Sequence, residues 1–347
     1  MRPAEWRFMY SVLSGRKIMN SKAQLSLKGF DFDESEIRQN YMLQVRMSYG
    51  NSCNLACRFC AVDGYRNDKP CENHLGIAQR LNILNNIKQR FGTRSVFLNG
   101  RGELTLEPDL DQLIHGISDL GIIPIIATNG TKLFDNNSAN WKLLYESGAS
   151  IILKMNSWEN KALEARMFGL NQESPEYKSI RRITESKEGR EWLGRFANDN
   201  RVAMNAVICK DTAGPDGVPS VWRFCRDNNI VPWFTWLEIM GRATADMALP
   251  DEEKKTLVKD LQKIDEEYGY NPVVPPYFDL CYPPVKADEK FIQITNIGRI
   301  FLFEYTWDGN FTITNYGRIP MEELFGMLAA GGHKISDGIQ KIQQKVF

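Results

Sequence analysis

The sequence predicts an α/β fold, a partial (β/α)6 barrel of the TIM type with a small α/β appendage at its C-terminal end. Between residues 41 and 245, short apolar runs alternate about six times with amphipathic helical patterns. This order is typical of a parallel sheet with helices on its outside. Each unusual motif of the region follows an apolar run, and barrels of this kind carry their chemistry at the C-terminal ends of their strands.

The chain divides where this alternation begins and ends. We expect an N-terminal extension over residues 1–40, the partial barrel over residues 41–245 and the appendage over residues 246–347. The appendage begins with a charged helix near residues 251–267. A proline-rich loop, short alternating strands and two short helices follow it.

Six strands and the helices between them make up the predicted barrel. The apolar runs that indicate strands cover residues 41–49, 95–100, 121–130, 147–156, 201–209 and 229–239. Stripes of apolar residues at helical spacing cover residues 77–91 and 110–120, and the polar stretch over 158–198 is also helix-like.

Composition argues against nucleic-acid-binding proteins and membrane proteins. The chain has 347 residues, and its 43 basic and 43 acidic residues give a formal net charge of zero. A general nucleic-acid binder would carry a basic excess, so no nucleic-acid partner is expected. No stretch approaches 18 uninterrupted apolar residues and the start has no apolar signal region, so we expect no membrane partner and a cytoplasmic location.

The stretch NSCNLACRFCAVDGYR holds Cys53, Cys57 and Cys60 in the spacing C-x3-C-x2-C. A structural zinc ion takes four ligands, and His74 would have to complete such a site. Three thiolates on a [4Fe–4S] cluster instead leave one iron without a protein ligand, where a substrate or cofactor binds. The other alternative is three unrelated buried cysteines. The spacing and the polar, glycine-free loop after the first strand argue against it.

This cysteine loop after the first strand of a partial barrel resembles that of the radical S-adenosylmethionine (radical SAM) superfamily. Phe59, directly before the last cysteine, matches the aromatic residue common there. The resemblance covers about residues 41–245. It implies a [4Fe–4S] cluster on the three cysteines and S-adenosylmethionine (SAM) chelated to the fourth iron. It further implies that a reduced cluster cleaves SAM to methionine and a 5′-deoxyadenosyl radical, which removes a hydrogen from the substrate.

Two turns agree with the family's SAM-binding motifs. NGRGELTLEP stands where the family has a Gly-Gly-Glu-Pro stretch at the second strand, and the resemblance assigns Gly100, Gly102 and Glu103 to the cofactor. Arg101 and Leu104 depart from that motif. ATNGT matches a turn common at the third strand and points to Thr128 and Asn129.

Two later segments complete the predicted cofactor site. ILKMNSW occupies the place of the family's fourth-strand segment, and strand alternation would aim Lys154 and Asn156 the same way, toward the cofactor ribose. LEIMGRA resembles the segment beside the adenine, with Glu238 and Arg242 as candidates. An acidic residue at a strand end is also common as a helix partner or a solvated charge.

Four cysteines remain outside this loop. The region after residue 280 resembles a degenerate SPASM/Twitch-type module, because an initial cysteine, a hairpin with Gly298 and a helix are present but the cluster cysteines are missing. Cys209 and Cys225 are predicted to be small buried hydrophobes. A second cluster that combines them with Cys281, or with Cys71, needs four converging thiolates.

Cys281 is the candidate catalytic residue. It lies in the proline-rich loop, and a thiol is a good hydrogen-atom donor. In some radical SAM epimerases a lone C-terminal cysteine quenches the substrate radical. We therefore expect epimerisation of a small polar, sugar-like metabolite in a biosynthetic reaction. Alternatives are radical elimination or dehydration, dehydrogenation, peptide modification and simple packing of Cys281.

The resemblance also implies a one-electron donor such as flavodoxin or ferredoxin as a partner. Two classes of protein other than an enzyme fit the cysteines. One is a ferredoxin-like electron carrier, which would need neither the glycine turn nor the Thr-Asn-Gly turn. The other is a zinc-stabilised binding protein.

Overall fold

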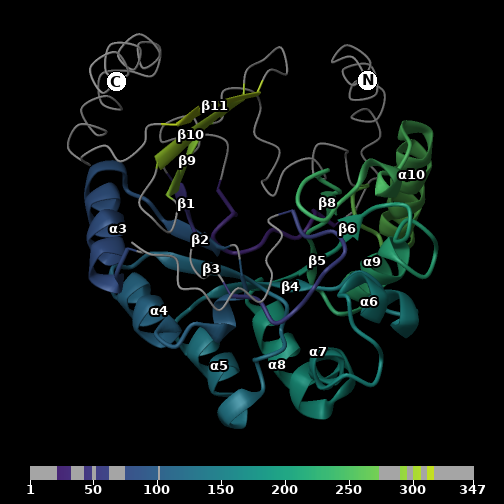
Figure 1. Cartoon of the computed structure of the whole chain (residues 1–347), viewed down its shortest axis with the longest axis horizontal. Helices are drawn as coiled ribbons and strands as arrows, with labels where there is room; N and C mark the ends of the chain where they lie inside the picture. The colour runs from purple at the N-terminus through teal and green to yellow at the C-terminus, as the bar shows by residue number, and fades with distance from the viewer. Residues whose placement is uncertain are drawn as a thin grey trace.

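A computed structural model describes residues 22–32, 43–48, 52–61, 75–100, 102–272, 290–294, 300–305 and 311–315. Figure 1 shows an arc of strands with the helices α3 to α9 arranged along its outer side. The predictions for His74, Cys71, Arg101, Cys281, Gly298 and the final helices concern residues outside these ranges.

Six parallel strands form the centre of the sheet. They are β1 (Gln44–Ser48), β2 (Ser95–Asn99), β3 (Ile123–Thr128), β4 (Ser150–Lys154), β5 (Val202–Asn205) and β7 (Val231–Pro232), paired in this order. Because β7 lies at one end of the strand order and β11 at the other, the described sheet is an open arc. The predicted α/β class and partial barrel are confirmed.

The last two predicted strands are each interrupted. The fifth continues as β6 (Val207–Ile208) and the sixth as β8 (Thr235–Trp236), and these two short strands pair separately. Both strands break at the same level. Two backbone bonds, from Trp233 N to Met204 O (2.8 Å) and from Thr235 N to Ala206 O (3.0 Å), carry the pairing across the break.

The helices cover the outer face of the sheet. They are α3 (Ile77–Phe91), α4 (Leu110–Asp119), α5 (Asp135–Glu146), α6 (Lys161–Met167), α7 (Pro175–Glu185), α8 (Lys187–Asn198), α9 (Val218–Asp227) and α10 (Asp251–Glu267), with short 3-10 turns at Leu104–Leu106 and Ala245–Met247. The apolar stripes of α3 and α4 are buried as predicted, at Leu84 and Ile87 in α3 and at Leu113 and Ile117 in α4, for example. This layer is the main hydrophobic core.

The inner face of the arc is filled at the N-terminal ends of the strands. Leu27 and Phe30, from the segment before β1, pack against Phe97, Ile152 and other inward-facing residues of the sheet. The backbone of this segment also accepts hydrogen bonds from strand beginnings, including one from Ser95 Oγ to the carbonyl of residue 29 (2.7 Å). Within the described ranges, this packing closes the interior at the N-terminal ends of the strands.

The C-terminal strands extend the same sheet. β9 (Lys290–Ile294) pairs in parallel with β1, and β10 (Ile300–Tyr305) and β11 (Phe311–Asn315) follow in antiparallel order. The region predicted as an appendage thus contributes strands next to the one that leads into the cysteine loop. None of the helices in the described part of the chain has the length and apolar character that crossing a bilayer demands.

Candidate cofactor site

The three clustered cysteines lie on the loop that follows β1. Cys53, Cys57 and Cys60 are each half-buried, and all three line a cavity of about 450 Å³. The cavity lies where several strands end, since Asn99, Thr128, Lys154 and other strand-end residues form its walls. This is the edge of the sheet where the sequence places the chemistry.

Most residues predicted to contact the cofactor meet around this cavity. Its lining includes Phe59, Gly100, Gly102, Glu103, Thr128, Asn129, Lys154 and Glu238. Asn156 is not among the lining residues and is fully buried. Because β4 ends at Lys154, strand alternation does not carry through to Asn156.

Several lining residues were missed by the sequence interpretation. Arg46 and Phe97 reach the cavity from inside β1 and β2, and Asn205, Trp233 and Trp236 reach it from the interrupted fifth and sixth strands. The alternation of side chains along each strand places these residues on the inner face and could have predicted their position. No loop motif marks them.

The first half of the cysteine loop is held by the turns after β2 and β3. The backbone N–H of Glu103 donates to Ser52 O at 2.7 Å. The Asn54 side chain donates to Thr131 Oγ1 at 2.9 Å and accepts from the Asn129 amide at 3.0 Å. The loop and the Thr-Asn-Gly turn therefore form one hydrogen-bonded unit.

Glu103 is a buried carboxylate that ties the ends of β2 and β3 together. One oxygen accepts hydrogen bonds from the Thr105 backbone N–H (3.1 Å), the Thr105 hydroxyl (2.7 Å) and the Thr128 hydroxyl. The other oxygen accepts the Asn129 backbone N–H at 2.7 Å. Burial raises the pKa of Glu103, while these donors act in the opposite direction. The side chain thus fixes the shape of the cavity wall, and its contact with a cofactor stays a prediction.

The three thiols have the chemistry of metal-cluster ligands. Burial raises the pKa of Cys53, and burial together with the neighbouring Cys53 raises that of Cys57 to about 12. Binding must therefore displace the thiol protons, as thiolate ligation of a metal requires. Three thiols beside an open cavity are the donor set of a [4Fe–4S] cluster with one iron left for another ligand.

Known proteins resemble this chain over part of its length. No family model matches the sequence. Two curated relatives from Haemophilus influenzae, strains PittEE and 86-028NP, are named GTP 3′,8-cyclase, and each is 27% identical to this chain. The first match covers 179 residues, 50% of this chain and 47% of the relative. The chain thus spans about half the length of the curated relatives it matches.

Solved structures show the same fold. SuiB from Streptococcus suis bound to S-adenosylmethionine matches with a TM-score of 0.54 at 17% identity, over 77% of this chain and 62% of SuiB. SuiB bound to its precursor peptide SuiA gives a TM-score of 0.53 at 19% identity, over 77% and 61%. The GTP 3′,8-cyclases and SuiB are radical SAM enzymes. This chain shares its fold with SuiB and resembles the curated relatives over half of its length.

Lys154 supplies a cation to the wall of the cavity. Its ammonium lies 4.5 Å from the centre of the Phe59 ring and donates a hydrogen bond to Asn205 Oδ1. Asn205 in turn donates to the Trp233 carbonyl at 2.6 Å. The last residue of β4 is thereby connected both to the cysteine loop and to the sixth strand.

Asn156 does not line the cavity, and its hydrogen bonds are to neighbouring backbone and side-chain groups. Its side-chain oxygen accepts the Val207 N–H at 3.3 Å. The backbone N–H groups of Asn156 and Ser157 both donate to Glu164 Oε2, at 2.7 and 2.8 Å. Glu164 is fully buried, and burial raises its pKa to about 8. This carboxyl therefore fixes the turn that follows Lys154.

Substituting Glu164 is expected to change how stability depends on pH. Because its folded-state pKa is raised from 4.5 to about 8, the neutral form stabilises the fold below about pH 4.5 and this contribution is lost as pH rises toward 8. The loss is on the order of a few kcal/mol. In Glu164→Gln, which stays neutral and keeps an acceptor, urea unfolding should show a smaller decline in free energy between pH 5 and 8. An unchanged decline would show that Glu164 does not titrate in this range.

Two further cysteines are placed away from the site. Cys209 and Cys225 are fully buried in separate hydrophobic clusters, so both are the buried small hydrophobes that the sequence predicts. Burial raises the pKa of Cys225. Their separation gives no support to a second cluster built on this pair.

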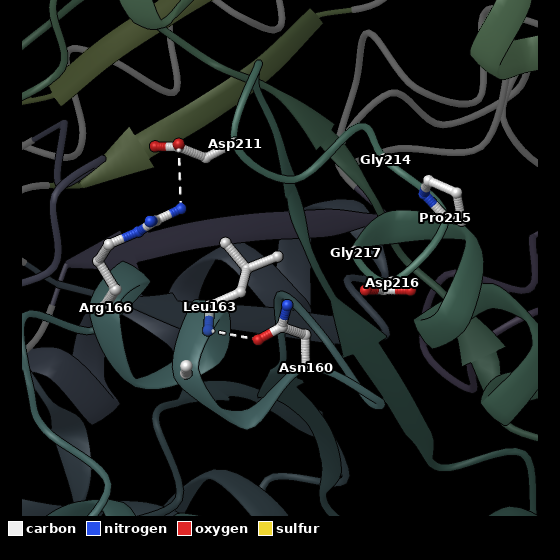
Figure 2. A pocket seen from close by; sticks show the side chains of 9 residues that line it. Asn160, Leu163, Arg166, Asp211, Gly214, Pro215, Asp216 and Gly217 are labelled. Atoms are coloured by element: carbon white, nitrogen blue, oxygen red, sulfur yellow. Dashed lines mark hydrogen bonds and ion pairs between the residues drawn. The ribbon is translucent and has the colours of Figure 1, made fainter.

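A second hollow, of about 430 Å³, lies between α6 and the loop before α9. Figure 2 shows Arg166 and Asp211 facing each other across it, paired at 3.2 Å. Asp211 also forms an ion pair at 3.2 Å with Arg58, a residue that lies between Cys57 and Cys60 in the sequence. The hollow contains none of the predicted cofactor residues. It therefore borders the cysteine loop without being part of the candidate site.

Proposed function

We propose that this chain is an enzyme that binds a [4Fe–4S] cluster through Cys53, Cys57 and Cys60 and SAM in the adjoining cavity. The observation that carries the proposal is the meeting of these thiols with the turns after β2 and β3 around one cavity. When bound and reduced, the two cofactors supply a 5′-deoxyadenosyl radical that abstracts hydrogen from a substrate. A volume of about 450 Å³ lies within the range of small-molecule sites.

The side chains of the cavity support distinct roles in binding. Lys154 and Asn129 offer donors to the polar groups of SAM, and Glu238 offers an acceptor. Trp233 and Trp236 add apolar surface to the wall of the cavity. Such a wall excludes water from the space in which a reactive radical must survive.

We propose a small polar metabolite as the substrate. The name of the curated relatives, GTP 3′,8-cyclase, refers to a small polar molecule. The precursor peptide in the SuiB structure supports peptide modification as the alternative, but that likeness concerns the fold. Turnover of a panel of nucleotides, sugars and aminoglycoside-like compounds would support the first class. Binding of a peptide with no small-molecule turnover would contradict it.

The proposed reaction requires a one-electron donor, such as flavodoxin or ferredoxin, and a cytoplasmic location suits an oxygen-sensitive cluster. The rival is a ferredoxin-like electron carrier with the same cluster. Electron paramagnetic resonance (EPR) of the anaerobically reduced protein separates the two. Addition of SAM should change the signal of the cluster, because SAM binds the iron that has no protein ligand. An unchanged signal at saturating SAM would favour the carrier.

We propose epimerisation as the reaction, with Cys281 as the hydrogen donor; its support is the sequence alone. With no second cluster supported at Cys209 and Cys225, oxidation of a substrate radical by the protein is disfavoured. Elimination or dehydration is the runner-up because it needs no donor.

Turnover in D2O tests this proposal. The wild-type protein should place one solvent deuterium at the inverted carbon of the product. Cys281→Ala should still form 5′-deoxyadenosine but fail to complete the product. Normal turnover by this variant would show that Cys281 is only a packing residue and would remove the epimerase assignment.

A further inference from the structure

We propose that Arg242 is a positioning residue for the cluster, which holds the second half of the cysteine loop and raises the reduction potential of the bound cluster. The inference rests on the proposed function, because it concerns the cluster that Cys53, Cys57 and Cys60 would hold. It differs from the role beside the adenine that the sequence resemblance suggests for this segment.

Arg242 makes two contacts with the backbone of the cysteine loop. Its own N–H donates to Cys60 O at 3.0 Å, and its guanidinium Nη1 donates to Cys57 O at 3.4 Å. The Cys57 carbonyl also accepts the Cys60 N–H at 3.3 Å, which closes the turn between these cysteines. One residue from the segment after β8 therefore engages the carbonyls of two cluster ligands.

The residue before Arg242 allows this close approach. Gly241 has φ +61°, and a Cβ atom there would lie 2.3 Å from Cys60 O and 2.7 Å from Ala61 O. Both the left-handed backbone and the lack of space require glycine at this position. Gly169 is in similarly close contact with the loop, because a Cβ there would lie 2.4 Å from Ala56 O. Two glycines from later segments therefore pack directly against the backbone of the cysteine loop.

The charge of Arg242 lies close to the cluster ligands, since its guanidinium contacts the Cys57 carbonyl at 3.4 Å. Lys154 adds a second cation, because it lines the same cavity as the three thiols. Reduction adds one negative charge to a cluster that already carries three thiolates. A nearby cation stabilises the reduced state more than the oxidised state, and charge and hydrogen bonding around a cluster set its potential.

The test uses Arg242→Lys, which keeps the charge, and Arg242→Gln, which removes it. The control is Arg182→Gln, since Arg182 is an exposed arginine that pairs with Glu188 away from the cysteine loop. Each protein is reconstituted anaerobically, its iron and sulfide are counted, and its cluster is titrated with dithionite in the absence of SAM while EPR follows reduction. Because the EPR signal comes only from molecules that carry a cluster, the reduction potential can be measured even when part of the iron is lost.

We expect Arg242→Gln to shift the potential downward, so that the ratio of reduced to oxidised cluster at a fixed solution potential falls about tenfold. For a one-electron couple this is about 59 mV. Arg242→Lys should recover most of the shift, and Arg182→Gln should show none. A potential in Arg242→Gln equal to that of the wild type would overturn the proposal. Because SAM is absent, a failure to cleave SAM would count against the proposed function and not against this inference.

Discussion

Replacing Cys57 with alanine is expected to remove the cluster and all SAM cleavage. Two thiols would remain on the loop, and the lost ligand is the middle cysteine of the three, whose pKa burial raises to about 12. Iron analysis after anaerobic reconstitution should fall from about four atoms per chain to a small residue. Formation of 5′-deoxyadenosine should fall below detection.

The matched control for this variant is Cys225→Ala. Cys225 is fully buried, lies in the main hydrophobic core and is not among the residues that line the cavity. Its loss should lower the free energy of unfolding by about 1 kcal/mol and leave the iron content unchanged. Full iron content in Cys57→Ala would mean that the loop does not hold the cluster as proposed.

The second large effect is expected at Glu103. In Glu103→Ala, the hydrogen-bond donors of Thr105, Thr128 and Asn129 would all lose their buried acceptor. Each unsatisfied donor costs about 1–3 kcal/mol, so the free energy of unfolding should fall by on the order of 3–5 kcal/mol. Urea unfolding of the apoprotein measures this directly.

Glu103→Gln separates shape from charge at the same position. The amide keeps one acceptor oxygen and places an N–H₂ group where the other oxygen stood, so this variant should lose less stability than Glu103→Ala. If Glu103→Ala unfolds within about 1 kcal/mol of the wild type, the carboxylate does not hold the turns after β2 and β3 together.

Much of the fold follows from local patterns. The helix over residues 77–91 and the helix over residues 251–267 have the predicted bounds, because their apolar spacing and their flanking glycine and proline are local signals. The interruption of the fifth and sixth strands was not predicted. Both strands are interrupted at neighbouring positions, Ala206 and Trp233, where the pairing of β5 with β7 ends and that of β6 with β8 begins. Such an interruption depends on two neighbouring strands at once and cannot be predicted from the sequence of either strand alone.

The candidate site was predictable where the residues lie in strand-end turns. Phe59, Gly102 and Thr128 line the cavity. They could be predicted because they belong to motifs that occur in the same order as the strands. Asn156 does not, since its position depended on a strand that ends two residues earlier. The close fit of Gly169 and Gly241 against the cysteine loop was also beyond prediction, because it joins segments far apart in the sequence.

The central claim is that the cavity beside the cysteine loop cleaves SAM by one-electron reduction. The most direct measurement is the yield of 5′-deoxyadenosine after anaerobic reconstitution with iron and sulfide, followed by dithionite and SAM. We expect 5′-deoxyadenosine and methionine to form in equal amounts, and neither to form without dithionite or in Cys57→Ala. A protein that carries a full, reducible cluster but yields no 5′-deoxyadenosine would contradict the claim and indicate an electron carrier.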